Sequence, residues 1–382
     1  MIYSRTVLKL IQKTQKSILL LGPRQTGKST LIQSLKPDFT FNLAEEREFL
    51  RFSKDPDEIL NRLEGIKNKT VFIDEVQRIP SLLNTIQTLL DNKKRGLRFF
   101  LTGSSARKLK RGQANLLPGR LIALYLNTLT AREMEYSANT SQLLRFGSLP
   151  GIISEKSEFD QRQLLLTYSG TYLREEIQAE SLARNMEGFS RFLSVIASRT
   201  TDFLDLAKFS NQASINRESA RRYFEVLEDT LIIETLEAFS QSNRRRLVQH
   251  PKFFLFDNGV LNGLLENFEL SSDRKGMLFE NLIYTQIKHS ARALGIPLKI
   301  FSYRTEHSAE VDLIVELRGS IWAIEVKSTD SVRKPDLRGF KSFQEYYGKK
   351  HERIIVHPGK ISSSIEGVHI LPWQVLLKEM GL

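Results

Sequence analysis

The sequence predicts an α/β protein that begins with a parallel sheet carrying helices on both faces, continues with a helical region and ends with a second α/β region. Over the first part of the chain, short apolar runs alternate with amphipathic helical patterns, as in buried parallel strands joined by helices. The middle of the chain has almost wholly helical apolar spacing. A long amphipathic helix and a new group of strands then follow towards the C-terminus.

In chain order, the strands predicted for the first sheet are 17–21, 39–43, 70–74, 98–102 and 121–126. The helical middle, 159–239, contains predicted helices at 203–211 and 216–229 and a β-ribbon at 231–239. The last region is predicted as helix 275–294, strands 298–303, 309–317 and 321–327, helix 337–347 and strand 353–356. We therefore expect three domains, 1–158, 159–250 and 251–382, which suits a chain of 382 residues.

The composition is that of a globular protein, with 41% hydrophobic and 26% charged residues. The chain has no cysteine, which excludes disulfides and thiolate metal sites. The apolar run at 18–21 is too short for a bilayer span or a signal-peptide core, so we expect a cytoplasmic protein without a membrane partner. The formal net charge of +12 favours a polyanionic partner such as DNA, and a generally basic, solvated surface is the equal alternative.

The segment from Gly22 to Ser29 fits the pattern G-x-x-x-x-G-K-[ST] at every fixed position, between a predicted strand and an amphipathic helix. In such a loop, backbone N–H groups converge on phosphates, and the helix N-terminus adds a favourable partial charge. Lys28 is expected to reach the β- and γ-phosphates, and Ser29 to bind Mg²⁺. The predicted ATP-binding residues are Gly22, Pro23, Arg24, Gln25, Thr26, Gly27, Lys28, Ser29 and Thr30.

Two carboxylates, Asp74 and Glu75, end the predicted strand at 70–74. Ligands of open α/β sheets bind at the carboxyl ends of strands, so we expect both beside the loop. Asp74 is predicted to hold Mg²⁺, and Glu75 to take a proton from the water that attacks ATP. Ser104, after the strand at 98–102, could contact the γ-phosphate, and an ordinary Gly-Ser turn is the alternative.

The loop, residues 73–78 and 102–105, and Leu117-Pro118-Gly119-Arg120 together resemble the AAA-like ATPases of bacteria and archaea. In that family a C-terminal region of unknown function follows the ATPase domain. The resemblance covers most of the chain and implies an AAA+ type ATPase domain. It also implies a homo-oligomer, such as a ring, in which an arginine acts on the γ-phosphate of a neighbouring subunit. Arg120 matches that role best, with a surface or DNA-facing arginine as the alternative.

The predicted helix, turn, helix and ribbon of the middle region resemble a winged helix, whose second helix often enters a DNA major groove. The apolar stripe of the helix at 216–229 leaves its arginines clear of the core, whereas Glu218, Glu225 and Glu228 on the same helix would repel DNA. The predicted DNA-binding residues are Arg217, Arg221, Arg222, Arg244, Arg245 and Arg246. Arg107, Lys108, Lys110 and Arg111 form a second basic cluster, for which a solvated charge run is the commoner explanation.

The element order of the last region is that of the PD-(D/E)XK nuclease fold. Asp312 lies in the middle of a strand, Glu325 and Lys327 share one face of the next, and Glu280 lies on the preceding helix. Three converging carboxylates would suit Mg²⁺ or Mn²⁺, and Lys327 could position the attacking water.

Two functions remain open at this stage. One is an ATP-driven DNA-processing enzyme whose C-terminal domain is a Mg²⁺- or Mn²⁺-dependent deoxyribonuclease. The other is a regulatory NTPase switch whose C-terminal domains bind partners without cleaving nucleic acid.

Overall fold

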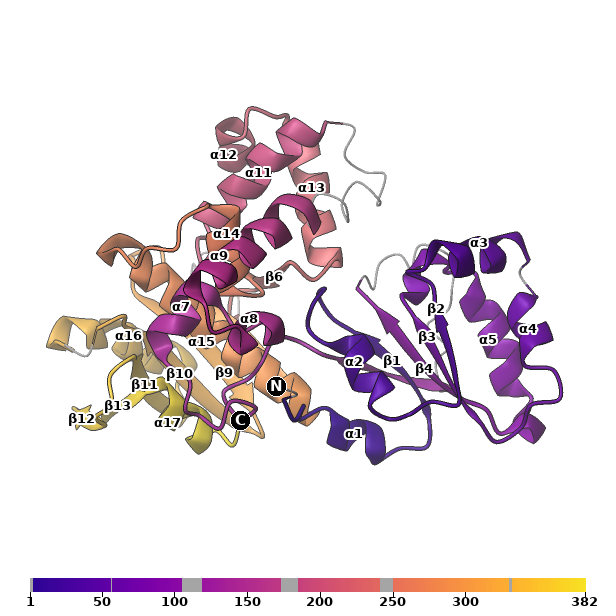
Figure 1. Ribbon diagram of the computed structural model, residues 1–382. Helices are drawn as coiled ribbons and strands as arrows, with labels where there is room; N and C mark the ends of the chain where they lie inside the picture. Colours follow the sequence, from indigo (N-terminus) through magenta and orange to yellow (C-terminus); the bar gives the residue numbers. More distant parts are fainter. Residues whose placement is uncertain (1–2, 56, 105–118, 173–184, 241–249, 330–331) are drawn as a thin grey trace. The chain divides into compact units, whose positions relative to one another are not determined.

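The computed structural model describes residues 3–55, 57–104, 119–172, 185–240, 250–329 and 332–382 (Figure 1). It divides into two compact units. The N-terminal unit is Ile2–Asn127 with Asp229–Leu231, and the C-terminal unit is Thr128–Glu228 with Ile232–Leu382. None of the helices in the described parts of the chain combines the length and apolarity needed to span a bilayer.

The N-terminal unit is built on a five-stranded parallel sheet of order β2-β3-β4-β1-β5 (Figure 1). Its strands are β1 (Ser17–Leu21), β2 (Phe39–Asn42), β3 (Thr70–Asp74), β4 (Arg98–Gly103) and β5 (Leu121–Tyr125). All five strands that the sequence predicts are therefore confirmed, with ends that differ by at most one residue. The helices are α1 (Leu8–Gln12), α2 (Lys28–Gln33), α3 (Glu46–Lys54), α4 (Glu58–Arg62) and α5 (Leu82–Asp91), with short turns η1 (Val76–Arg78) and η2 (Lys93–Arg95).

The three central strands β1, β3 and β4 are buried on both faces, which explains why they read as continuous apolar runs. Along β1, Leu19 and Leu21 join a core that includes side chains of α3, α4 and α5. Ile18 and Leu20 point to the opposite face, into a second core that includes side chains of α1 and α2. Helices on both faces of a parallel sheet are thus confirmed.

The C-terminal unit contains a six-stranded mixed sheet of order β12-β13-β11-β10-β9-β8. Its strands are β8 (Leu298–Arg304), β9 (Glu310–Leu317), β10 (Ser320–Val326), β11 (Glu352–His357), β12 (Ser363–Ile365) and β13 (Val368–Pro372). Its helices are α15 (Ser272–Leu294), α16 (Arg338–Tyr347) and α17 (Trp373–Glu379), with the turn η4 (Lys334–Leu337). The sequence predicts α15, α16 and four of these strands but not β12, β13 or α17.

The remaining elements of this unit are mainly helical. They are α7 (Thr140–Phe146), α8 (Pro150–Ser154), α9 (Glu158–Thr167), η3 (Tyr168–Tyr172), α11 (Met186–Ser198), α12 (Leu206–Gln212), α13 (Arg217–Asp229) and α14 (Asn258–Leu264). The predicted ribbon at 231–239 is corrected to a single strand, β6 (Ile233–Leu236), which pairs antiparallel with β7 (Lys252–Leu255).

Residues 128–158, which the sequence analysis assigns to the ATPase domain, pack in the C-terminal unit instead. Gln286 of α15 causes part of this difference: its Oε1 accepts the Ala131 N–H at 2.7 Å, and its Nε2 donates to the Leu129 carbonyl at 3.1 Å. Such long-range pairing leaves no local mark in the sequence.

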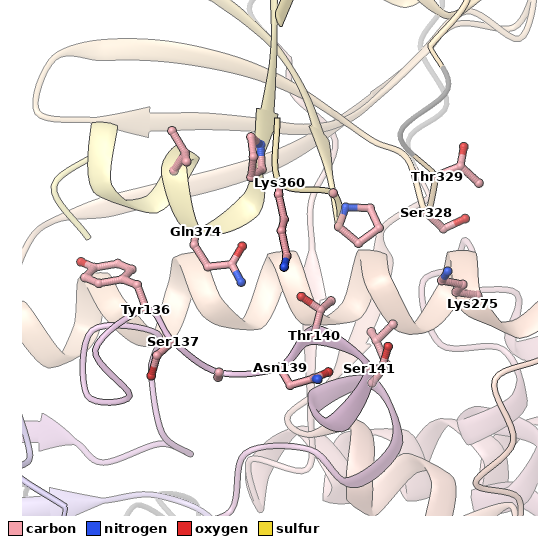
Figure 2. A pocket seen from close by; sticks show the side chains of 16 residues that line it. Tyr136, Ser137, Asn139, Thr140, Ser141, Lys275, Ser328, Thr329, Lys360 and Gln374 are labelled. Carbon is pink, nitrogen blue, oxygen red and sulfur yellow. The ribbon is translucent and has the colours of Figure 1, made fainter. Parts of the chain in front are cut away.

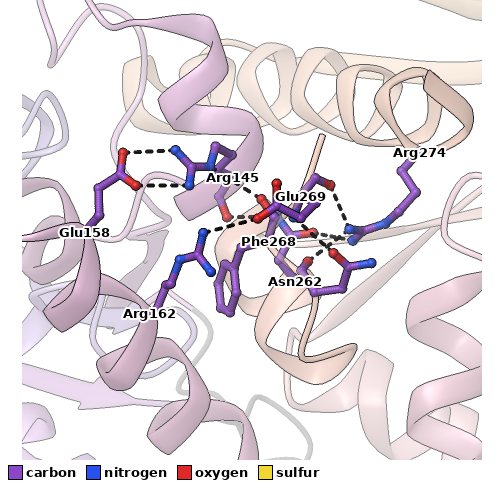
Figure 3. A network of polar contacts seen from close by, with 8 residues as sticks. Arg145, Glu158, Arg162, Asn262, Phe268, Glu269 and Arg274 are labelled. Atoms are coloured by element: carbon purple, nitrogen blue, oxygen red, sulfur yellow. Dashed lines mark hydrogen bonds and ion pairs between the residues drawn. The ribbon is translucent and has the colours of Figure 1, made fainter. Parts of the chain in front are cut away.

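Arginine side chains connect α7 and α9 with the chain around α14 (Figure 3). Arg145 of α7 forms a two-pronged ion pair with Glu158 of α9, at 2.9 and 3.0 Å. Arg274 donates to the Asn262 side chain at 2.6 Å and to the Glu269 carbonyl at 2.9 Å. Arg145 also donates to the Phe268 carbonyl at 3.4 Å, so these contacts join α7, α9, the chain around α14 and the start of α15.

Candidate functional site

The loop from Gly22 to Gly27 connects β1 to α2 at the carboxyl edge of the parallel sheet. At Gly22 a Cβ atom would lie 2.0 Å from the Leu126 carbonyl oxygen, so only glycine allows this close approach. Gly27 has a φ of 90°, which turns the chain into α2. The buried Lys28 donates from Nζ to the carbonyls of Gly22 and Pro23, at 2.9 Å each. Its ammonium is thus folded back over the loop.

Arg5 stabilises this loop through hydrogen bonds to backbone carbonyls, and no sequence motif identifies Arg5 as part of the site. Its Nη1 donates to the Thr26 carbonyl and its Nη2 to the Asn127 carbonyl, both at 2.6 Å. The side chain is buried, with 8% of the residue exposed. Two charge-assisted hydrogen bonds therefore fix the loop to the chain that follows β5.

Asp74 lies at the centre of the polar contacts beside the loop. Its Oδ1 accepts the Ser29 hydroxyl at 2.9 Å and also the Thr102 hydroxyl. Thr102 Oγ1 in turn accepts the Glu75 N–H at 3.2 Å. The structure thus brings Ser29 of α2 and Asp74 of β3 together at one edge of the sheet.

Glu75 and Ser104 are linked through Gln77, which the sequence analysis does not assign to the site. The buried Gln77 Nε2 donates to Glu75 Oε2 and, at 3.0 Å, to Ser104 Oγ. Glu75 has a left-handed backbone, with φ 58° and ψ 45°, which is uncommon for a residue with a Cβ. Residues held in such sparsely populated conformations cluster at functional sites. Gln77 is a positioning residue for the Glu75 carboxylate.

These donors fit a magnesium ion. The Ser29 hydroxyl and the Asp74 carboxylate are oxygen ligands 2.9 Å apart, and Mg²⁺ is commonly bound by one or two such groups together with substrate phosphates. Asp74 is 8% exposed, so the pair is largely shielded from solvent.

Arg120 lies away from this group of residues. It immediately precedes β5, whose first residue Leu121 pairs with Ser17, whereas the loop follows the other end of β1. Its guanidinium holds the Asp91 carboxylate at 2.6 and 3.0 Å. The structure therefore does not bring Arg120 to the loop of its own chain.

Two of the predicted nuclease-like carboxylates, Glu280 and Asp312, converge around an ammonium group, whereas the third, Glu325, has a different partner. Lys252 Nζ lies 3.0 Å from Glu280 Oε1, 2.8 Å from Glu310 Oε1 and 3.6 Å from Asp312 Oδ1. Lys327 Nζ pairs with Glu325 at 3.1 Å and with Asp336 at 3.3 Å. Neither Lys252 nor Glu310 is part of the predicted site.

The charges in this cluster are strongly coupled. Burial alone would lower the pKa of Lys252, but Glu280, Asp312 and Glu310 outweigh it and raise the pKa above its usual range. Burial, with Asp312 nearby, raises the pKa of Glu325. Across the described ranges, no group of three or more histidine, aspartate or glutamate side chains is placed so that it could hold a metal ion. These side chains do not fit the predicted Mg²⁺ or Mn²⁺ ion while Lys252 lies among the carboxylates.

On α13 the three predicted arginines lie on the exposed face. Arg217, Arg221 and Arg222 are exposed, whereas Ala220, Tyr223, Phe224, Val226 and Leu227 are buried. Asn216 caps the helix by accepting the Ser219 N–H at 2.7 Å. The predicted clusters at 244–246 and 107–111 lie outside the described residues.

A cavity of about 780 Å³ in the C-terminal unit contains none of the predicted site residues (Figure 2). Lys275, Lys360, Thr140 and Gln374 are among the side chains that line it, and Lys360 and Gln374 point towards Thr140. It is lined by polar and apolar side chains, and no pattern in the sequence points to it.

Comparison with known proteins separates three parts of the chain. Residues 14–135 match the sequence model of the AAA domain. The loop and its neighbouring carboxylates all lie within this match. Residues 14–135 are therefore similar to an AAA-like ATPase domain. Residues 137–271 and 275–376 match two domains of unknown function, DUF8612 and DUF4143.

Two mycobacterial proteins match most of the chain. The uncharacterized protein Rv2008c of Mycobacterium tuberculosis is 29% identical over 321 residues, which are 82% of this chain and 70% of the relative. The uncharacterized protein Mb2031c of Mycobacterium bovis has the same values.

Similarity to solved structures is low. A variant of RuvB from Thermotoga maritima is 15% identical with a TM-score of 0.29, over 60% of this chain and 85% of that one. A signal transduction ATPase with numerous domains from Pyrococcus horikoshii is 14% identical with a TM-score of 0.23. This match covers 75% of this chain and 46% of that one. The similarity to an AAA-like ATPase domain therefore rests on the sequence match of residues 14–135.

Proposed function

We propose that this chain binds ATP with Mg²⁺ and hydrolyses the bond to its γ-phosphate. The observation that carries the proposal is that Lys28, Ser29, Asp74 and Glu75 meet at the carboxyl edge of one parallel sheet. Nucleotides bind at this edge in open α/β sheets.

Each residue has a distinct role in the proposal. Lys28 exchanges the carbonyls of Gly22 and Pro23 for phosphate oxygens, so its present bonds keep the ammonium at the loop before ATP arrives. Ser29 and Asp74 would hold Mg²⁺, which neutralises phosphate charge when bound.

Glu75 accepts a proton from the attacking water, and Gln77 holds the carboxylate in place through its donated hydrogen bond. Ser104, bonded to the same Gln77, would contact the γ-phosphate and link a change there to Glu75 through Gln77.

ATP turnover and binding by two variants test the proposal. Lys28→Ala should weaken ATP binding, because it removes the cation that reaches the phosphates. Glu75→Gln should bind ATP normally but lose roughly 10²–10⁴-fold in phosphate release, the usual contribution of a general base. Lys67→Ala and Glu64→Gln are the matched controls, since both residues are exposed in the same unit. Equal phosphate release by Glu75→Gln and the parent would remove Glu75 from its role.

A second proposal is that the chain acts on DNA through α13. The exposed Arg217, Arg221 and Arg222 support it, as does the succession of α12, a short turn and α13, which is the order of a helix-turn-helix. Strands β6 and β7 follow, as in a winged helix. The exposed Glu218 and Glu225 on α13 oppose DNA, so the contact would be made by the arginine side chains rather than by the whole helix face.

Of the two functions open from the sequence, the geometry of the C-terminal unit favours the switch without cleavage. Two of the carboxylates predicted for metal-dependent hydrolysis, Glu280 and Asp312, lie beside Lys252, and the third, Glu325, is paired with Lys327. We therefore propose an ATP-dependent, DNA-binding switch whose nuclease-like domain does not cut.

A further inference from the structure

The acidic cluster of the C-terminal unit is assembled from three elements and receives a cation from a fourth. Glu280 comes from α15, Glu310 and Asp312 from β9, and Glu325 from β10. Lys252 enters from β7, and only 4% of its side chain is exposed. Glu280 and Asp312 are also largely buried, with 15% and 14% of their side chains exposed.

The position of Lys252 is fixed by the packing of its strand. Phe253 beside it packs edge-on against Phe209 and Phe224, with ring centroids 5.8 and 5.7 Å apart. Phe254 stacks on Tyr284 of α15 at 3.9 Å. These aromatic contacts hold β7 in place, so the ammonium cannot leave the cluster by a local shift of its backbone.

Several other oxygen atoms of the cluster also have partners. Asp312 Oδ2 accepts the Val326 N–H at 2.8 Å. Arg304 lies 3.7 Å from the second oxygen of Glu310. Lys327, which follows Glu325 by two residues on the same face of the chain, forms ion pairs with both Glu325 and Asp336. A divalent ion among these carboxylates would lie beside an ammonium ion and would be repelled by it at short range in a poorly solvated site.

We propose that Lys252 is the resident cation of this cluster and takes the place that a divalent metal has in a metal-dependent nuclease. The C-terminal unit is then stabilised by its own ion pairs, needs no metal to fold and cleaves no phosphodiester bond. The inference concerns a unit separate from the ATP site, so it holds or fails independently of ATP hydrolysis.

Thermal unfolding of the nucleotide-free full chain, with and without Mn²⁺, tests this inference. The parent should unfold at the same temperature in both conditions. Lys252→Met keeps the length of the side chain but leaves the carboxylates unpaired, so it should unfold at a lower temperature without metal. Mn²⁺ at about a hundredfold excess over its Kd should then raise that midpoint by roughly 5–10 °C.

Two further variants test whether the response to Mn²⁺ comes from the acidic cluster. Lys252→Met combined with Glu280→Gln should lose most of the response to Mn²⁺, because one ligand is removed. Lys299→Met, an exposed lysine of β8 that pairs with Glu316 at 3.7 Å, should behave as the parent. If Lys252→Met does not fold, Lys252→Gln takes its place, since it keeps one hydrogen-bond donor for the carboxylates.

The inference is overturned if Mn²⁺ stabilises the parent and Asp312→Asn abolishes that effect, because the cluster would then bind metal with Lys252 present. It is also overturned if the folded Lys252 variant shows no response to Mn²⁺. Cleavage of plasmid DNA by the parent with Mn²⁺, abolished in Asp312→Asn, would contradict it directly. The parent measurements decide the question even if no Lys252 variant folds.

Discussion

Single buried polar side chains organise both sites of this chain. Arg5 fixes the phosphate-binding loop, Gln77 holds Glu75, and Lys252 pairs with carboxylates of the acidic cluster. Each of them bonds to groups that are distant in sequence or that belong to another element. A buried charge or amide is costly unless such partners are present, so each of these side chains is tied to one arrangement of the fold.

None of these three residues can be assigned from the sequence alone, and the reason is physical. Lys28, Ser29, Asp74 and Glu75 are recognisable because phosphate binding requires fixed spacing along the chain. Arg5, Gln77 and Lys252 act through space, and a lone arginine, glutamine or lysine carries no spacing to detect. Gln77 alone has a signal, since it stands in the segment 73–78 that resembles the AAA-like family.

Glu234 gives a prediction at the residue scale. Burial alone would raise its pKa, but Lys288 and Arg292 of α15 lower the pKa to about 2. Arg292 meets both carboxylate oxygens, at 2.6 and 3.0 Å. The folded pKa thus lies below the ordinary glutamate value, so this pairing stabilises the fold above about pH 4.5 and loses that effect as the pH falls towards 2.

Glu234→Gln should therefore lower the free energy of unfolding near pH 7 by about 3 kcal/mol, because it leaves two cations without their counter-ion. It should also unfold with a flatter acid dependence than the parent. Urea unfolding across the acidic range measures both effects, with Glu237→Gln as the exposed control on the same segment. Identical acid profiles for Glu234→Gln and the parent would show that the pairing contributes nothing.

At the scale of elements, the central strands β1, β3 and β4 of the first sheet are predictable because burial on both faces makes each one a short, largely apolar run. The pairing of β6 with β7 is not predictable from the sequence, because the two strands are separated by residues 237–251 and β7 has only four residues. Strand β12 escapes prediction for a similar reason. β12 has three residues of which two are exposed, so it shows no apolar period.

Helix α13 gives the prediction at this scale. Replacing Arg217, Arg221 and Arg222 together by alanine should weaken DNA binding and flatten its salt dependence. The slope should fall by about one unit for each phosphate that these arginines neutralise in the parent. Binding to labelled duplex DNA over a range of salt concentrations measures the slope.

The matched control replaces three exposed cations of another helix, Arg47, Arg51 and Lys54 of α3. This control tests whether the loss of net charge alone explains a change in DNA affinity or in its salt dependence. An unchanged slope for the α13 variant would place the DNA contact elsewhere on the chain.

For the whole molecule, the question is whether one chain contains a complete ATP site. Arg120 precedes β5 at the amino edge of the sheet, and the loop follows β1 at the carboxyl edge, about 15 Å away along the strands. Within its own chain Arg120 holds Asp91. An action on ATP therefore requires a second copy of the chain, whereas a structural role requires only Asp91.

Mixing two inactive variants distinguishes these roles. If Arg120 acts on a neighbour, Arg120→Ala should lose roughly 10³–10⁵-fold in turnover, as expected for an arginine finger. Mixed with Lys28→Ala, it should recover activity, because the loop of one subunit meets the intact Arg120 of the other. Random assembly would make about a quarter of such interfaces competent. Asp91→Asn is the control, because it breaks the ion pair and leaves Arg120 in place. Loss of turnover by Asp91→Asn equal to that of Arg120→Ala, with no recovery in demonstrated mixed oligomers, would assign Arg120 to the structure of its own chain.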